Sequence, residues 1–321
     1  MKLLIVGGSG HVGSAVIRHF AGPECDVVVL SRRAAEIPGA RVVQWDGATL
    51  GDWAREFDGV DAVLNLAGRS VNCRYNRANL DEMMRSRVDS TRLVGQAIQG
   101  ARRPPKVWLQ SATATIYAHR FDAPNDELTG ALGGGEPGSS PTWDASIEIA
   151  KAWERTLDEA ETPNTRKVAL RSAMTMSNDP GSVFDVFCRL ARRGLFGTLG
   201  DGRQFVSWIH EDDYCGAMRF LIEHEELSGP VNLCSPNPLP QAEFAVELRA
   251  ALGVRFGLPA AKWMIELGCW AMRTESELVL KSRRVVPTRL LDAGYEFRFA
   301  TWREACWNLA SRRRDAAQDS P

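Results

Sequence analysis

The sequence predicts an α/β protein, in which a doubly wound parallel sheet carries helices on both faces and a smaller, mixed C-terminal domain follows. Short β-branched runs alternate with helical patterns through the first half, as a parallel sheet with crossover helices requires. The 321 residues, 44% of them apolar, are enough for a large core and about two structural units. After Arg171 the alternation ends, so a second unit begins there.

Each predicted strand is a short apolar run, and the runs in the first half are residues 3–6, 27–30, 42–44, 62–66, 107–110 and 168–170. Helical periodicity covers residues 12–20, 80–98 and 145–159. The second of these helices ends near Gly100, ahead of two prolines, as a helix stop should. We therefore expect a dinucleotide-binding domain over residues 1–172.

The second half has a mixed pattern. Its helical stretches are residues 183–192, 213–223, 241–252, 261–272 and 302–311, with an extended stretch at 204–209. We expect residues 208–228 to return to the first domain, and residues 173–207 and 229–321 to form the smaller substrate-binding domain. The polar residues 312–321 are expected to fray. The segment 129–141, rich in glycine and proline, is either a surface connection or an active-site lid.

Charge and cysteine usage narrow the class of protein. The 39 Lys and Arg residues nearly balance 40 Asp and Glu, so we expect neither nucleic acid nor a membrane as a partner. Seven cysteines without a C-x-x-C pair, and five histidines without metal spacing, favour a reducing cytoplasm and no metal site. Glycines soon interrupt the apolar start, so we expect no targeting segment. We expect a small-molecule substrate as the partner, and the sequence leaves open whether the protein forms a homodimer.

A glycine-rich turn predicts the cofactor site. Gly7, Gly10 and Gly13 are spaced three apart, directly after a predicted buried strand and directly before a helix. In this context the first glycine allows a tight turn, the second lets the backbone approach a pyrophosphate, and the third lets the helix pack on the strand. The helix N-terminus then faces the anion. The turn, with Ser9, His11 and Val12, predicts a Rossmann-type dinucleotide site.

The end of the second strand predicts which dinucleotide binds. An NAD site places an acid there for the ribose 2′-hydroxyl, whereas this sequence has Ser31, Arg32 and Arg33. A hydroxyl and two guanidiniums suit a 2′-phosphate, because charge-assisted hydrogen bonds to phosphate are strong. We therefore expect NADP(H).

With these residues placed, the chain resembles the extended short-chain dehydrogenase/reductase superfamily, and within it the YfcH-like epimerase family with its distinctive C-terminal segment. The resemblance covers almost the whole chain. It is carried by the glycine turn, Asn65-Leu66-Ala67-Gly68, residues 86–92, Ser111-Ala112-Thr113, Trp153-Glu154, residues 202–210 and residues 278–289.

The resemblance implies roles for several of these residues. Asp46 would meet the adenine amino group, while Ser111 and the segment from Asn65 through Leu66 and Ala67 to Gly68 would bind the cofactor. Thr113 would hydrogen-bond a substrate carbonyl or alcohol, unless its hydroxyl only satisfies its own turn. Arg203 would grip the substrate in a cleft whose aromatic wall includes Trp208. The basic run at residues 281–284 either lengthens an anion site or is solvated or internally paired.

The superfamily also uses a Tyr-x-x-x-Lys motif, which is absent from this sequence. Lys151 is present, where it either clamps the ribose or is solvated, but Ile147 stands four residues before it. In the register shifted by one, the two positions hold Ser146 and Ala150. Ile147 is expected to point into the cleft beside the nicotinamide. The candidate catalytic residues are therefore Thr113, Tyr117 and Lys151, where Tyr117 either supplies a proton or has a packed or surface role.

These observations favour an NADP(H)-dependent oxidoreductase acting on an unidentified small carbonyl or alcohol. A non-catalytic NADP(H)-binding sensor or regulator is the alternative, since a missing general acid costs about 10²–10⁴ in rate. A nucleotide-sugar epimerase is a third reading.

Overall fold

The computed structural model describes residues 1–34, 36–136 and 140–318. Its first domain is organised by a parallel sheet with strand order β10-β6-β5-β4-β1-β2-β3. The strands are β1 (Lys2–Val6), β2 (Asp26–Ser31), β3 (Arg41–Gln44), β4 (Ala62–Asn65), β5 (Val107–Thr113), β6 (Arg166–Ser172) and β10 (Gly229–Leu233). The order reverses between β1 and β4, and open α/β sheets bind ligands beyond the carboxyl ends of their strands at such a point.

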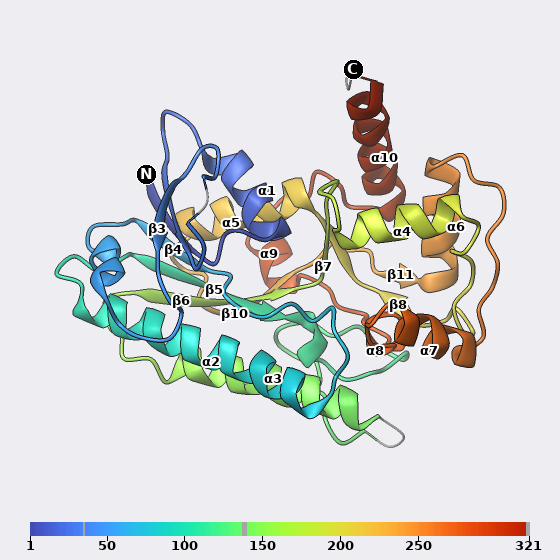
Figure 1. Ribbon diagram of the computed structural model, residues 1–321, viewed down its shortest axis with the longest axis horizontal. Coiled ribbons are helices and arrows are strands. Elements are labelled where there is room, and N and C mark those ends of the chain that lie inside the picture. Colours follow the sequence, from blue (N-terminus) through green and yellow to red (C-terminus); the bar gives the residue numbers. More distant parts are fainter. Residues whose placement is uncertain (35, 137–139, 319–321) are drawn as a thin grey trace.

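Helices cover both faces of this sheet, as predicted (Figure 1). Because side chains alternate along a strand, Leu3 and Ile5 of β1 pack on one side, in the core that includes α1 (His11–Phe20) and α5 (Glu211–Glu223). Leu4 and Val6 pack on the other side, in the core that includes α2 (Arg77–Gly100) and α3 (Pro141–Asp158). Apart from the edge strand β3, which is exposed to half-buried, the apolar runs of the first half are therefore strands buried on both faces.

The last strand of the sheet was not predicted. β10 pairs with the edge strand β6 in parallel register, so the return segment continues through Leu233 rather than ending near residue 228. Its sequence, Gly-Pro-Val-Asn-Leu, contains a proline and a buried asparagine, and this composition is weak as a strand signal. β10 forms a strand because it pairs with the edge of β6, and not because of its own composition.

The C-terminal part has its own core and gathers at one side of the sheet (Figure 1). The rings of Phe244 and Trp302 stack there with centroids 4.0 Å apart. The remaining elements are β7 (Met174–Met176), α4 (Val183–Arg192), β8 (Phe205–Val206), β9 (Trp208–His210), β11 (Leu239–Pro240), α6 (Gln241–Ala251), α7 (Lys262–Ala271), α8 (Glu277–Leu280), α9 (Thr288–Asp292) and α10 (Trp302–Gln318). Among them, α9 packs on the core of the parallel sheet through Leu290. Two 3₁₀ turns complete the fold, η1 (Asp52–Phe57) and η2 (Ala114–Ile116).

Helix α10 corrects one expectation. Instead of fraying from residue 312, it continues to Gln318. Arg312 lies 2.6 Å from Asp212 of α5, and Arg313 pairs with Asp185 of α4. These ion pairs tie the last turns to two other helices, a long-range effect that local composition does not reveal. In the part of the chain that the structure describes, no helix has the length and apolarity to cross a membrane.

Candidate functional site

The glycine turn has the geometry of an anion-binding site. Gly7 has φ +79°, and a Cβ there would lie 2.8 Å from the Cα of Ala67. A Cβ on Gly13 would lie 2.2 Å from the carbonyl oxygen of Gly8, so the helix packs directly on the turn. Gly10 caps α1 without a side-chain hydrogen bond, and a Cβ there would meet nothing within 4 Å. The helix N-terminus is thus open, and its N–H groups fit a pyrophosphate.

Of the residues that the sequence assigns to the adenosine end of a dinucleotide, some are exposed and others are buried. Arg32 and Arg33 are exposed just beyond β2, whereas Ser31 is buried and its hydroxyl accepts a hydrogen bond from the Arg33 amide at 3.2 Å. Asp46 is exposed, and hydrogen bonds from Thr49 lower its pKa to about 2. The two arginines therefore have the surface that a 2′-phosphate needs. Beside the turn, Ser9 and His11 are exposed and Val12 is half-buried.

The Asn65 side chain has a structural role that the sequence did not indicate. Its amide is fully buried, donates to Gln110 at 3.0 Å and accepts from the Ala67 amide at 3.0 Å. Ala67 is itself buried against Gly7, Leu66 is half-buried, and Gly68 is exposed. Asn65 thus fixes the turn after β4, and Gly68 offers the most exposed surface of the four.

A cavity of about 220 Å³ lies at the carboxyl end of β5. Ser111 and Thr113 line it from the strand, and Tyr75 and Arg87 line it from α2 and the loop before it. Thr113 is half-buried, and its Oγ1 accepts a hydrogen bond from the Thr115 amide at 3.2 Å. The turn thus uses an acceptor site of Thr113, and the hydroxyl can still donate into the cavity.

Helix α3 presents Ser146, Ile149, Ala150 and Trp153 to this cavity. Their spacing of three and four residues places them on one helix face. The register that faces the cavity is therefore the shifted one, in which Ser146 and Ala150 replace the motif's tyrosine and lysine.

Two residues of the other register point elsewhere. Ile147 is 1% exposed and packs toward Gly133, so the expectation that it points into the cleft is wrong. Lys151 lies outside the cavity lining, with its ammonium 3.3 Å from Glu148 and beside Gly134. The cause is the 100° turn between successive helix positions, which the motif alone does not fix.

Tyr117 is not placed as a proton source. It is 2% exposed and outside the cavity lining, and its hydroxyl donates to Asn232 and accepts from Arg171, each at 2.9 Å. Burial raises its pKa to about 12. Tyr117 therefore ties η2 to β6 and β10, which is the packed role rather than the proton source of the two that the sequence left open.

The two expected substrate residues also lie outside the cavity. Trp208 is fully buried in the C-terminal core, with its ring 5.2 Å from that of Trp302. Arg203 is exposed, and its guanidinium lies 5.9 Å from the Phe121 ring. Trp208 therefore packs in the core instead of forming the aromatic wall that the resemblance implied. Side chains alternate along β9, and this alternation turns the Trp208 ring inward.

Sequence reasoning missed Glu277 of α8, which lines the cavity and is 1% exposed. Its carboxylate accepts a hydrogen bond from Ser146 at 2.7 Å and lies 3.6 Å from Lys281 and 3.7 Å from Arg283. Burial raises the pKa of Glu277 and lowers that of Lys281 to about 8. The basic run at residues 281–284 was the available signal, and its internal pairing with a buried acid is the reading that the structure supports.

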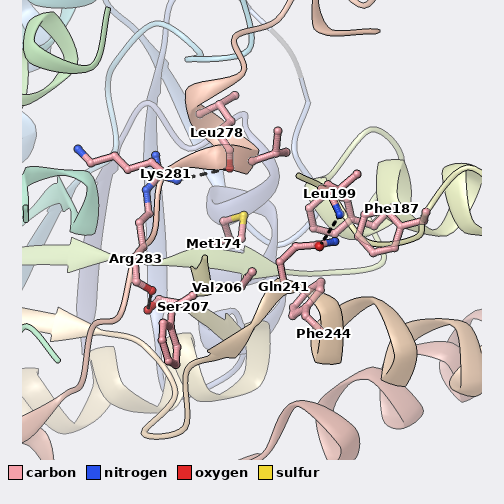
Figure 2. Close-up of a pocket in the computed structure, with 13 residues that line it drawn as sticks. Met174, Phe187, Leu199, Val206, Ser207, Gln241, Phe244, Leu278, Lys281 and Arg283 are labelled. Atoms are coloured by element: carbon pink, nitrogen blue, oxygen red, sulfur yellow. Dashed lines mark hydrogen bonds between the residues drawn. The ribbon is translucent and has the colours of Figure 1, made fainter. Parts of the chain in front are cut away.

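Lys281 and Arg283 also border a second, apolar pocket. Figure 2 shows both side chains at one end and Phe187, Leu199 and Phe244 at the other. This pocket encloses about 20 Å³, room for roughly one water molecule. It is a packing gap, so the cavity at β5 is the candidate substrate site.

The segment 129–141 is partly anchored. The amide of Gly133 donates to the Ile116 carbonyl at 2.8 Å, and the Ala118 amide donates to the Ala131 carbonyl at 2.9 Å. Its first half therefore packs against η2, and residues 137–139 lie outside the described residues. Whether the rest is a lid or a connection stays a prediction.

Comparison with known proteins agrees with this architecture. The model of the NAD dependent epimerase/dehydratase family matches residues 3–234, and a domain of unknown function, DUF1731, matches residues 260–309. The epimerase family protein SDR39U1 of Homo sapiens is 29% identical over 304 residues, covering 93% of this chain and 96% of that protein. The Bos taurus protein of that name is 30% identical, covering 93% and 96%.

Solved structures give the same result. The crystal structure of human epimerase family protein SDR39U1 (isoform 2) with NADPH has a TM-score of 0.83 at 27% identity, covering 97% of this chain and 99% of that one. UDP-N-acetylglucosamine 4-epimerase from Bacillus cereus has a TM-score of 0.74 at 17% identity, covering 98% and 99%, and shares the fold. With a family match that includes the glycine turn and runs from β1 to β10 of the parallel sheet, this chain belongs to the NAD dependent epimerase/dehydratase family.

Proposed function

We propose that this protein is an NADP(H)-dependent oxidoreductase that acts on a small carbonyl compound or alcohol. The observation that carries the proposal is the cavity at the carboxyl end of β5, where the hydroxyls of Thr113 and Ser146 line one space. Beyond that end of a parallel sheet is where α/β proteins of this topology bind ligands. The cavity therefore offers two hydroxyl groups to a substrate, even though the sequence lacks the superfamily's Tyr-x-x-x-Lys motif.

Three observations support NADP(H) as the cofactor. The open N-terminus of α1 suits the pyrophosphate, and the exposed Arg32 and Arg33 suit the 2′-phosphate. NADPH is also present in the crystal structure of the human relative. When bound, this cofactor supplies a hydride.

The chain's own residues would orient the substrate and supply a proton. Thr113 would donate a hydrogen bond to the carbonyl oxygen and polarise it. Ser146 is hydrogen-bonded to Glu277, and burial raises the pKa of Glu277. In alcohol oxidation the Ser146 hydroxyl would accept the alcohol proton as it passes its own to the Glu277 carboxylate, and in carbonyl reduction the same transfer would run in reverse. This pair replaces Tyr117 in the scheme expected from sequence.

The side chains of α3 argue against a nucleotide-sugar epimerase, the third reading. The superfamily's motif uses a tyrosine on this helix, whereas Ser146 and Ala150 face the cavity.

The test is NADPH oxidation by the purified protein with a panel of small aldehydes, ketones and oxo acids. Cofactor binding is measured in the same samples. We expect turnover with at least one compound, and a loss of turnover without loss of NADPH binding in Thr113→Val. Thr156→Val, on the outer part of α3, is the matched control. Tight NADPH binding with no turnover across the panel would favour the sensor function instead.

A further inference from the structure

Arg87 is a buried cation without an acidic partner among the residues that the structure describes. It extends from α2 into the cavity lining and is 9% exposed. Its guanidinium donates to the Met83 carbonyl at 3.1 Å and lies 4.9 Å from the centroid of the Trp153 ring. Among the described residues, no carboxylate lies within 4.0 Å of it. Burial lowers the pKa of Arg87 to about 10, as expected for a charge that lacks compensation.

Arg283 brings a second guanidinium to the same cavity from the C-terminal segment. Its Nε donates to the Thr115 hydroxyl at 3.3 Å and its Nη1 to the Glu277 carbonyl at 3.2 Å, whereas its buried Nη2 has no hydrogen-bond partner. The Tyr75 phenol lies near both guanidiniums: burial raises its pKa, Glu277 adds to the shift, and Arg283 and Arg87 oppose it. The two cations therefore converge on one space.

The local charges do not balance. Glu277 is shared between Lys281 at 3.6 Å and Arg283 at 3.7 Å, and Arg87 has no share in it. Lys281 also has the Glu136 carboxylate nearby and does not line the cavity. In the cavity lining, the two guanidiniums of Arg87 and Arg283 therefore face one carboxylate, that of Glu277. Buried charges are costly unless they are paired and hydrogen-bonded, so a bound anion would stabilise this arrangement. A carboxylate suits it best, because a guanidinium donates two parallel hydrogen bonds to such a group.

We infer that the cavity binds a carboxylate through Arg87 and Arg283, and that the substrate is a small oxo acid or the corresponding hydroxy acid. The inference rests on the proposed oxidoreductase function and names its substrate class. In the reductive direction the carbonyl carbon gains a hydride from NADPH and its oxygen gains a proton. The products are a hydroxy acid and NADP⁺.

The cofactor's own phosphates are the other source of anionic charge. The residues that fit them belong to the glycine turn and the end of β2, and none of these lines the cavity. We therefore assign the carboxylate to the substrate, and the experiment distinguishes a substrate carboxylate from a cofactor phosphate.

The test measures binding without chemistry, using protein saturated with NADP⁺, which cannot reduce a carbonyl. Calorimetric titrations compare pyruvate, 3-oxobutanoate and 4-oxopentanoate with their methyl esters. We expect at least one acid to bind at least tenfold more tightly than its ester. Arg87→Gln and Arg283→Gln should each lower the affinity for that acid about tenfold, with NADP⁺ affinity within about twofold of wild type. Arg284→Gln, whose side chain lies over the Phe205 ring, is the adjacent control and should bind the acid normally.

Equal affinity for acid and ester, or no binding of any acid, would overturn the inference. So would arginine variants that weaken NADP⁺ itself, because the anion would then be a cofactor phosphate. The comparison of acid with ester uses wild-type protein and decides the question even if a variant does not fold. Since no turnover is required, a failure here is distinguishable from a failure of the NADPH oxidation assay.

Discussion

The Ser146 hydroxyl donates a hydrogen bond to the Glu277 carboxylate at 2.7 Å, across 131 positions of sequence. It joins the helix that carries the family's catalytic motif to the C-terminal segment, and both side chains are buried. On the face of α3 that lines the cavity, a serine thus binds an acid from another part of the chain.

We predict that Ser146→Ala destabilises the protein by about 1–3 kcal/mol, because the buried Glu277 carboxylate loses a hydrogen-bond donor. Urea denaturation at neutral pH measures the free energy of unfolding. Thr156→Ala is the control on the same helix, since its hydroxyl bonds only the Ala152 carbonyl. An equal loss of unfolding free energy in Ser146→Ala and Thr156→Ala would contradict a stabilising role for the hydrogen bond between Ser146 and Glu277.

Cofactor selectivity gives a second prediction. NADPH should bind at least tenfold more tightly than NADH, a difference of about 1.4 kcal/mol. Arg32→Ala combined with Arg33→Ala should remove most of that preference, since both exposed guanidiniums are placed for the 2′-phosphate. Fluorescence titration of both cofactors measures it, with Arg77→Ala on the exposed start of α2 as control. Equal affinities in the wild type would rule out the assignment.

Placing a tyrosine at residue 147 should not restore the superfamily motif. Ile147 is 1% exposed against Gly133, so Ile147→Tyr overpacks this contact and should cost about 1–3 kcal/mol of stability without a gain in rate. Single-turnover NADPH oxidation and urea denaturation test the two parts. A rate increase in this variant would mean that position 147 reaches the substrate after all.

Thr113→Val should lower turnover by roughly 10²-fold while NADPH affinity changes by less than about twofold. Its hydroxyl lines the cavity, and a contact made mainly in the transition state has this signature. Single-turnover kinetics and NADPH titration of the same samples measure both effects. Full activity in Thr113→Val would remove the threonine from the mechanism.

Lys281 gives a prediction for alkaline pH. Burial lowers its pKa to about 8 from an ordinary 10.5, so between these values the unfolded chain binds the proton and the folded protein does not. The free energy of unfolding therefore gains a contribution that rises with pH in this window. Urea denaturation from pH 7 to pH 10 should show a more positive slope for wild type than for Lys281→Met. Parallel profiles would contradict the burial of a titrating lysine.

Local sequence determined the dinucleotide half of this protein. Short apolar runs specify the parallel strands, and the spacing of Gly7, Gly10 and Gly13 specifies the turn, because strand burial and glycine sterics act within a few residues. The family itself followed from such motifs. Strand β10 was missed because its pairing depends on a free sheet edge rather than on its own composition.

The substrate half was decided by tertiary structure. Which of Ser146 and Ile147 faces the cavity depends on a helix rotation of about 100°, and whether Trp208 is a wall or core depends on which way a strand turns its side chains. Glu277 and Arg283 share a cavity with Ser146 and Arg87 only because the C-terminal segment folds back to the carboxyl end of β5. Sequence patterns report the periodicity of each element, but the orientation of one element against another is set by the packing of the whole chain.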